Sequence, residues 1–319
     1  MRFSPGLQGL RGVAIVLVVA CHLGLVPGGW VGVDVFFVLS GYLITRLLME
    51  RRSLRDFYAG RARRLLPALA LLLGTVAVVG GVAVLPSVAI GASYTMNFAR
   101  FEGQSFSPLG HLWSLAQEEQ FYLLWPLLLY AVRPRSRALL AAGLMLCSLT
   151  ALHVAVMYGA QFSRLYFGPD THALPLLAGC LLALVPGVPR ATAARIVGIG
   201  GAAVLALAVR HDAKTTDEFE TALLLATVGG AALVVAALED PRLLCGRVLQ
   251  RLGLYSYGIY LWHYPLIVWL PDGLAVVLTI VVAAVSFHLV EVPIRRRLVS
   301  AKSKRTFDTP QARADAAAA

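Results

Sequence analysis

The chain alternates long apolar runs with short polar segments, and most of the runs have the length of a membrane-crossing helix. Such a helix needs about 20 mostly apolar residues. Ten segments meet this criterion, with approximate ranges 12–28, 31–48, 65–87, 110–132, 138–157, 170–186, 194–210, 219–238, 254–270 and 273–292. The pattern predicts an all-α, polytopic membrane protein with about ten transmembrane helices.

The fourth segment is the weakest of the ten, because only residues 121–132 are cleanly apolar, and a run that short is also typical of a re-entrant segment. Charge favours a full crossing. With ten spans and a cytoplasmic N-terminus, all but four of the 28 Lys and Arg residues lie in segments expected in the cytoplasm, as the positive-inside rule requires. The four exceptions are Arg100, Arg164, Arg210 and Lys214. Both termini are therefore expected in the cytoplasm.

Composition supports a membrane location. The chain is 58% hydrophobic and only 14% charged, whereas a soluble domain has about 25% charged residues. The net charge of +11 comes from basic residues beside apolar runs, which is typical of a membrane surface and not of a nucleic-acid site. We expect a multi-pass protein of the cell membrane, in contact with the bilayer and with no nucleic-acid partner.

The domain plan has two parts. Residues 1–297 are expected to form one membrane domain, and the polar, Ala-rich residues 298–319 a disordered cytoplasmic tail. The four cysteines show no paired spacing, which argues against a disulfide framework and a Cys-based zinc site. We predict no metal site.

Two polar residues of the first two spans are candidates for chemistry, because charge at bilayer depth costs at least about 2.5–3.5 kcal/mol. His22 follows Arg11 by eleven residues, about 16 Å along a helix, which places it past the membrane midplane. It suits general-base catalysis, with a hydrogen bond to a neighbouring helix as an equally weighted alternative. Asp34 enters from the outer face at a similar depth and either orients His22 or caps the second span, the cap being favoured.

Two arginines precede the third span. Arg61 and Arg64 are three residues apart and share a helix face, so two planar guanidinium groups point at one ligand. Phosphate binding from the cytoplasm is one interpretation, and anchoring to lipid headgroups is the commoner one at a helix end.

Further polar groups lie in the later spans. Glu118 and Glu119 in the fourth span point about 100° apart and are expected to have different partners. In the ninth span, Tyr260 and His263 lie too deep for an interfacial belt. Glu291, at the inner end of the tenth span, is expected to form a salt bridge with Arg295 or with the two arginines before the third span.

Taken together, these residues resemble the acyltransferase 3 family of integral membrane enzymes, which O-acylate polysaccharides, peptidoglycan, glycolipids and some antibiotics. The similar segments follow family order and cover nearly the whole chain. They are 7–11 with His22, 32–42, Arg61 with Arg64, 113–115, 118–122, 170–171, 256–258, 260–263, and Glu291 with Pro293 and Arg295. The resemblance is to standalone members without an appended hydrolase-like domain.

The resemblance implies an acyl-CoA co-substrate, usually acetyl-CoA, bound from the cytoplasm, and no tightly bound cofactor. The acceptor is expected to be a hydroxyl of an extracytoplasmic carbohydrate or glycolipid. The predicted catalytic residues are His22, Glu118 and Asp34. The predicted substrate-binding residues are Arg11, Arg61, Arg64, Ser40, Tyr42, Trp113, Ser114, Glu119, Asp170, Tyr260, His263 and Glu291.

The chain departs from the family pattern at a few positions. Gln8 stands where Asp is usual and Gly60 where a basic residue is usual, both on the donor side. Ala116 and Gln117 replace Ser-Val, and His172 replaces Arg on the acceptor side, where it is expected to reflect a different acceptor.

The predicted mechanism is direct transfer, in which His22 deprotonates the acceptor hydroxyl, with a covalent acyl-histidine as the alternative chemistry. A rival function is a proton-coupled transporter of a small solute or glycolipid. Its relay would comprise His22, Glu118, Glu119, His263 and Glu291. A third, less favoured hypothesis is a non-catalytic partner that positions a lipid-linked glycan.

Overall fold

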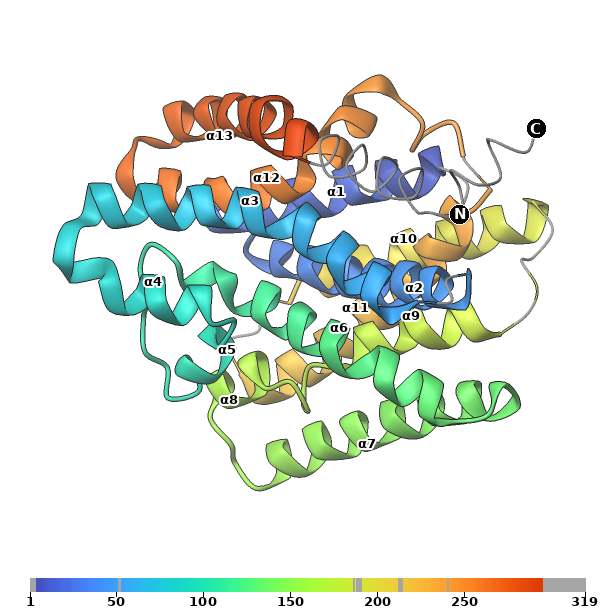
Figure 1. The fold of residues 1–319 in the computed structure, drawn as a ribbon. Helices are drawn as coiled ribbons and strands as arrows, with labels where there is room; N and C mark the ends of the chain where they lie inside the picture. Colours follow the sequence, from blue (N-terminus) through green and yellow to red (C-terminus); the bar gives the residue numbers. More distant parts are fainter. Residues whose placement is uncertain are drawn as a thin grey trace, which may run out of the picture.

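The computed structural model describes residues 4–50, 53–185, 187, 191–211, 215–239 and 241–294, and within these ranges it contains helices and no strand (Figure 1). The α-helices are α1 Pro5–His22, α2 Val31–Glu50, α3 Leu54–Gly80, α4 Leu85–Ala92, α5 Met96–Ala99, α6 Trp113–Ala131, α7 Arg137–Met157, α8 Phe162–Phe167, α9 Leu174–Leu184, α10 Ala191–Val209, α11 Thr216–Ala237, α12 Arg247–Trp269 and α13 Asp272–Ser286. Short 3₁₀ turns are η1 Pro27–Trp30, η2 Gly81–Val84, η3 Gly110–Leu112 and η4 Pro134–Ser136, and η5 Phe287–Glu291 is a π turn. The proposed tail, 298–319, lies outside the described residues.

Every predicted span contains a helix, and the all-α, multi-pass class is confirmed. Seven helical segments of the described chain are long and apolar enough to cross a membrane; they contain α1, α2, α3 with α4, α7, α10, α11, and α13 with η5. The remaining three predicted spans correspond to α6, α9 and α12. α9 has only 11 residues, most of them buried, while α6 and α12 carry polar residues of the site described below. The count of ten spans and the cytoplasmic termini stay predictions.

Helix boundaries differ from the predicted ones where caps intervene. Ser4 accepts a hydrogen bond from the N–H of Leu7 and Pro5 occupies the first turn, so α1 begins seven residues earlier than predicted. It ends at His22, followed by Gly24 at φ +70°. As a result Arg11 lies inside α1, not at its mouth, and His22 is its last residue. Ser53 likewise caps α3, which places Arg61 and Arg64 within the helix.

Close helix contacts depend on glycine at the centre of the molecule. A Cβ on Gly41 of α2 would lie 1.9 Å from the Leu176 carbonyl oxygen of α9, and one on Gly253 of α12 would lie 1.9 Å from the Gln8 carbonyl oxygen of α1. Only glycine permits these approaches, which is the usual way that membrane helices pack tightly. α2 therefore packs against α9, and α1 against α12.

The interior and the periphery are distinct. In the hydrophobic stretch of η1 and α2, 72% of the residues are buried, against 17% in that of η4 and α7. Figure 1 shows α7 and α13 at opposite edges, with α1 and α2 between them. The edge helices expose large apolar side chains such as Leu139 and Val277, which suits contact with lipid. The polar site consequently lies among the inner helices.

Candidate active site

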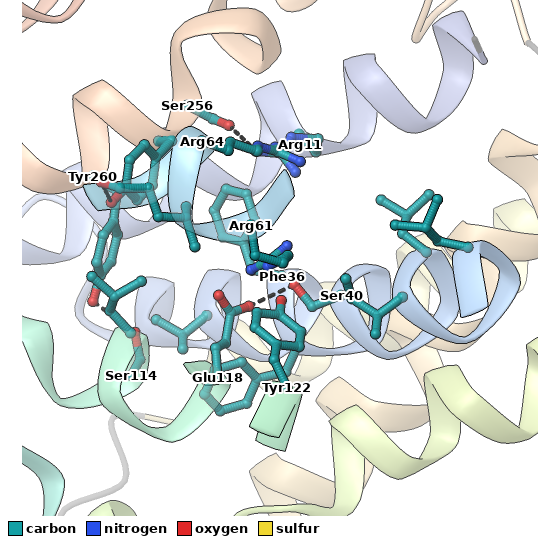
Figure 2. A pocket seen from close by; sticks show the side chains of 18 of the residues that line it. Arg11, Phe36, Ser40, Arg61, Arg64, Ser114, Glu118, Tyr122, Ser256 and Tyr260 are labelled. Atoms are coloured by element: carbon teal, nitrogen blue, oxygen red, sulfur yellow. Dashed lines mark hydrogen bonds between the residues drawn. The ribbon is translucent and has the colours of Figure 1, made fainter. Parts of the chain in front are cut away.

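A cavity of about 370 Å³ lies between α1, α2, α3, α6 and α12. Figure 2 shows its polar side chains converging from these helices. Three arginines and one carboxylate, Glu118, are among the residues that line it. The other side chains are mostly apolar, including Phe36, Phe37, Leu43, Ile44, Leu47, Phe57 and Leu65. The cavity thus combines an apolar wall with an excess of positive charge.

The arginines are held by the cavity wall. Arg61 makes a 3.0 Å salt bridge from Nη2 to Glu119 Oε1, and its guanidinium carbon lies 3.7 Å from the centre of the Tyr122 ring. Its buried Nε has no hydrogen-bond partner among the described residues. Arg11 Nη2 donates to Ser256 Oγ at 2.8 Å (Figure 2). Preorganised guanidinium groups with unused donors suit an anionic ligand.

The two adjacent glutamates have different partners, as predicted from their angular separation on α6. Ser40 Oγ donates to Glu118 Oε1 at 2.6 Å (Figure 2), while Glu119 binds Arg61. Glu118 lines the cavity and Glu119 does not. Glu118 therefore lies in the cavity wall, separate from the group formed by His22, His111 and His263.

Tyr260 and Ser114 line the cavity next to a group of histidines. The Tyr260 hydroxyl donates to the carbonyl oxygen of His111, and it lies 2.6 Å from Ser114 Oγ. Because the tyrosine proton is committed to the carbonyl, Ser114 is the donor to Tyr260. The ring of Tyr260 contacts the rings of His111 and His263, at centroid distances of 5.5 and 5.6 Å. Tyr260 thus lies between the cavity and these imidazoles.

Three histidines from different elements form the next layer. His263 of α12 lies 4.9 Å from His22 of α1 and 5.3 Å from His111 of η3, measured between ring centroids. His263 and His111 are buried, whereas His22, at the end of α1, is exposed. Tyr264 packs against both His22 and His111. His22 is therefore accessible at the end of α1 and packs against Tyr264 and His263 on its inner side.

Of the two roles predicted for Asp34, contact with His22 is wrong. Asp34 Oδ1 lies 2.7 Å from His172 Nε2, and both side chains are fully buried. His172 Nδ1 donates to the Tyr166 carbonyl oxygen at 2.6 Å. Asp34 lies in the first turn of α2, where a carboxylate interacts favourably with the helix dipole, but among the described residues its side chain accepts no capping hydrogen bond from a backbone N–H. The carboxylate is directed to the segment before α9 because α2 packs on α9 at this level.

The remaining predicted residues divide into groups. Arg11, Ser40, Arg61, Arg64, Ser114, Glu118 and Tyr260 line the cavity. Trp113 packs on Phe37 and His172 and so belongs with the Asp34 pair. Tyr42 is buried in the core beside α11, outside the cavity lining.

Two predicted residues lie apart from the cavity. Asp170, between α8 and α9, is bound by both terminal nitrogens of Arg164, at 2.9 and 2.7 Å. Burial acts to raise its pKa, but the Arg164 guanidinium outweighs burial and lowers the pKa below its usual range. Glu291 is buried in η5, which packs against α3, and its expected partner Arg295 lies outside the described residues.

Sequence reasoning missed three residues that the structure adds. Tyr122 contacts Arg61, and Ser256 accepts a hydrogen bond from Arg11. Both residues lie within the segments that resemble the family, so those segments could have identified them. His111 opens the fourth predicted span, but only the 3₁₀ turn η3 turns its ring toward α12, where its Nε2 bonds the Leu261 carbonyl at 3.2 Å.

The structure has an arginine-lined cavity inside a helical membrane protein, with an exposed histidine beyond the cavity. A known class of protein accounts for this arrangement. Residues 4–290 match the family described as acyltransferase domain, and the chain belongs to that family.

Among curated proteins, the chain is 36% identical to a putative peptidoglycan O-acetyltransferase, YrhL, of Bacillus subtilis, over 96% of this chain and 57% of the relative. It is 33% identical to the peptidoglycan O-acetyltransferase OatA of Listeria monocytogenes, over 92% and 56%, and 32% identical to the O-acetyltransferase OatA of Staphylococcus aureus, over 93% and 58%. The chain thus spans somewhat more than half the length of these relatives. No solved structure shows a significant match.

Proposed function

We propose that this protein is a membrane O-acyltransferase of the cell membrane that moves an acetyl group from acetyl-CoA to a hydroxyl of an extracytoplasmic glycan. The cavity carries the proposal: three arginines at one side, an apolar wall, and a single tyrosine between it and the His22 group. Peptidoglycan is the first candidate acceptor, because two of the similar proteins bear that substrate in their names.

The cavity chemistry supports an acyl-CoA donor. Arg11, Arg61 and Arg64 outnumber Glu118 among the charged lining residues, so the site attracts a polyanion. The guanidinium groups suit the phosphates of coenzyme A. The apolar wall suits its long pantetheine arm, and a volume of about 370 Å³ is in the usual range of small-molecule sites. Donor phosphates at the arginines would direct the thioester toward Ser114 and Tyr260.

His22 is the proposed general base. Its Nδ1 lies 2.9 Å from the Val18 carbonyl oxygen, so Nδ1 carries the proton of the neutral ring and Nε2 keeps its lone pair. Nε2 takes the proton of the acceptor hydroxyl as the oxygen attacks the thioester carbonyl carbon. The C–S bond then breaks, and the thiolate of coenzyme A receives that proton from His22. The exposed ring of His22 favours an acceptor that arrives from outside the protein.

The Ser114 and Tyr260 hydroxyls separate the donor cavity from His22. In the proposed cycle the thioester passes this pair, so the Ser114–Tyr260 hydrogen bond opens when the donor is bound. Family membership favours this acyl transfer over proton-coupled transport, the rival function predicted from the same polar residues.

The decisive experiment measures acetyl transfer from labelled acetyl-CoA to peptidoglycan fragments by the protein in membranes. We expect His22→Ala to lower turnover by about 10²–10⁴-fold. His153→Ala is the matched control, because His153 lies on α7, is 61% exposed and bonds only Glu220 among the contacts recorded for it. Near wild-type turnover in His22→Ala would overturn the proposed base.

A second measurement tests the donor without catalysis. A ligand that binds only the folded protein raises its apparent stability, by about 2.7 kcal/mol at 100 times its Kd. We expect millimolar acetyl-CoA to raise the melting temperature of the solubilised protein, and Arg11→Ala to abolish the shift. An unchanged melting temperature with the wild-type protein would contradict an acyl-CoA site.

A further inference from the structure

The hydrogen bonds of His22 define which atom of its ring can act. Nδ1 faces two groups, the Val18 carbonyl oxygen at 2.9 Å and His263 Nε2 at 3.4 Å. A carbonyl oxygen accepts only, so Nδ1 must carry a hydrogen. That hydrogen is shared between Val18 and His263, and His263 receives the longer branch.

The tautomer of His263 follows from its own helix. Its Nδ1 lies 2.7 Å from the Tyr260 carbonyl oxygen and 3.2 Å from that of Ile259. Both partners accept, so this Nδ1 is also a donor, and the neutral ring has its lone pair on Nε2. That lone pair faces His22. The hydrogen bond between the rings therefore runs in one direction, from His22 Nδ1–H to His263 Nε2.

Within the described part of the chain, His263 is the one side-chain acceptor recorded for His22. The groups facing this pair are His111 of η3, with Tyr260 and Tyr264 of α12. Arg100, after α5, interacts electrostatically with both His22 and His111. None of these groups is a carboxylate, and Asp34, the predicted partner, is engaged with His172.

We propose that His263 is the positioning residue of His22, a neutral imidazole that acts beside the Val18 carbonyl and holds the ring of the proposed base in one orientation. The inference rests on the proposed function and assigns to His263 the role that was predicted for Asp34. The acceptor stabilises the Nδ1–H tautomer before the reaction and the imidazolium that forms when Nε2 takes the hydroxyl proton. His263 itself gains no proton and touches no substrate.

Two amide substitutions of His263 test whether an acceptor atom is needed at the position of Nε2, because they carry the same functional group on side chains of different length. The Oε1 of His263→Gln can occupy the place of Nε2, whereas His263→Asn is one methylene shorter and cannot. We expect His263→Asn to lower kcat by about 10–100-fold with the KM for acetyl-CoA unchanged, and His263→Gln to retain kcat within about fivefold. His263→Leu, which has no side-chain acceptor, is expected to match His263→Asn.

The nitrogen resonance of His22 Nδ1 provides a readout that a merely structural role would not move. Nitrogen NMR of ¹⁵N-histidine-labelled protein is expected to show the Nδ1–H resonance of His22 at nearly the same position in the wild type and in His263→Gln, and shifted in His263→Asn, where the bond to His263 is lost and the bond to Val18 remains. Equal kcat in His263→Gln and His263→Asn, or an unchanged Nδ1 resonance in His263→Asn, would overturn the inference. These results are read against His22→Ala: activity that survives His22→Ala removes the proposed base, whereas activity that depends on His22 but not on His263 removes only the positioning role.

Discussion

Among the described residues, His172 and His22 each have one side-chain partner for a ring nitrogen, and the two partners differ. His172 has a carboxylate, Asp34 Oδ1, at 2.7 Å, and both side chains are inaccessible. His22 has a neutral imidazole, His263, at 3.4 Å, and the residue is exposed at the end of α1. Both nitrogens of His172 are engaged, so no lone pair is left for a substrate. The shorter, stronger contact is therefore the structural one.

The two pairs differ in their surroundings as well as in their partners. The aromatic rings of Phe37, Trp113, Tyr166 and Phe219 enclose His172. His22, by contrast, neighbours Tyr264 and the imidazoles beside the cavity. A sealed hydrogen-bonded pair joins α2 to the segment before α9, whereas an accessible histidine with a neutral support has the arrangement that the proposed proton transfer requires.

Removal of the carboxylate should produce the largest effect on stability. We expect Asp34→Ala to lower the free energy of unfolding by about 3–5 kcal/mol, because His172 then stays buried without its partner. The thermal melting temperature of the solubilised protein reports the loss, with His263→Gln as the control that melts close to wild type. Wild-type melting together with a lost kcat would reverse the comparison and make Asp34 catalytic.

Replacement of both partners should recover much of that loss. In Asp34→Leu with His172→Phe, neither side chain of the pair leaves a polar partner behind, and only the Tyr166 carbonyl oxygen loses its donor. Exchange of a whole buried pair for apolar side chains is often neutral. We expect the double variant to regain at least half of the stability lost in Asp34→Ala, and to retain acetyl transfer. Recovered folding with abolished transfer would show that the pair serves the reaction and not only the fold.

Sequence reasoning succeeded where local geometry decides the outcome. Ten apolar runs predicted ten helices because length and hydropathy are properties of a segment. Arg61 and Arg64 both reach the cavity because residues three apart share a helix face. Glu118 and Glu119 have different partners because neighbours on a helix point about 100° apart.

It failed where two distant segments meet. Asp34 and His22 were expected at the same depth, but depth does not specify which face of α2 the carboxylate occupies, and its partner lies 138 residues away. The ring of His111 reaches α12 through a short 3₁₀ turn that apolar periodicity does not reveal. The predicted start of α1 was also wrong, because a single capping hydrogen bond at Ser4 sets it, and a hydropathy pattern averaged over many residues does not detect one bond.

A change at the cavity should act on donor binding and leave the histidine pair alone. Arg61→Lys keeps the charge but loses the planar group over Tyr122, so we expect the KM for acetyl-CoA to rise about tenfold, or 1.4 kcal/mol, with kcat unchanged. Arg55→Lys, on the exposed side of the same helix, is the matched control. If Arg61→Lys lowers kcat and leaves KM alone, the cavity and the His22 group do not have separate roles.

The smallest expected effect comes from the hydroxyl between the two regions. Tyr260→Phe keeps the ring beside His263 and the backbone carbonyl that holds it, but removes the hydrogen bonds to Ser114 and His111, each worth about 1 kcal/mol. With the separating pair weakened, water reaches the thioester more readily, so we expect acetyl-CoA hydrolysis without acceptor to rise a fewfold while transfer changes less than threefold. Ser114→Ala removes one of the same bonds and should show the same direction with a smaller rise. Unchanged hydrolysis in both variants would mean that the Ser114–Tyr260 pair does not separate the donor from His22. The contact with His263 would then be the remaining feature that distinguishes the proposed base, His22, from the enclosed His172.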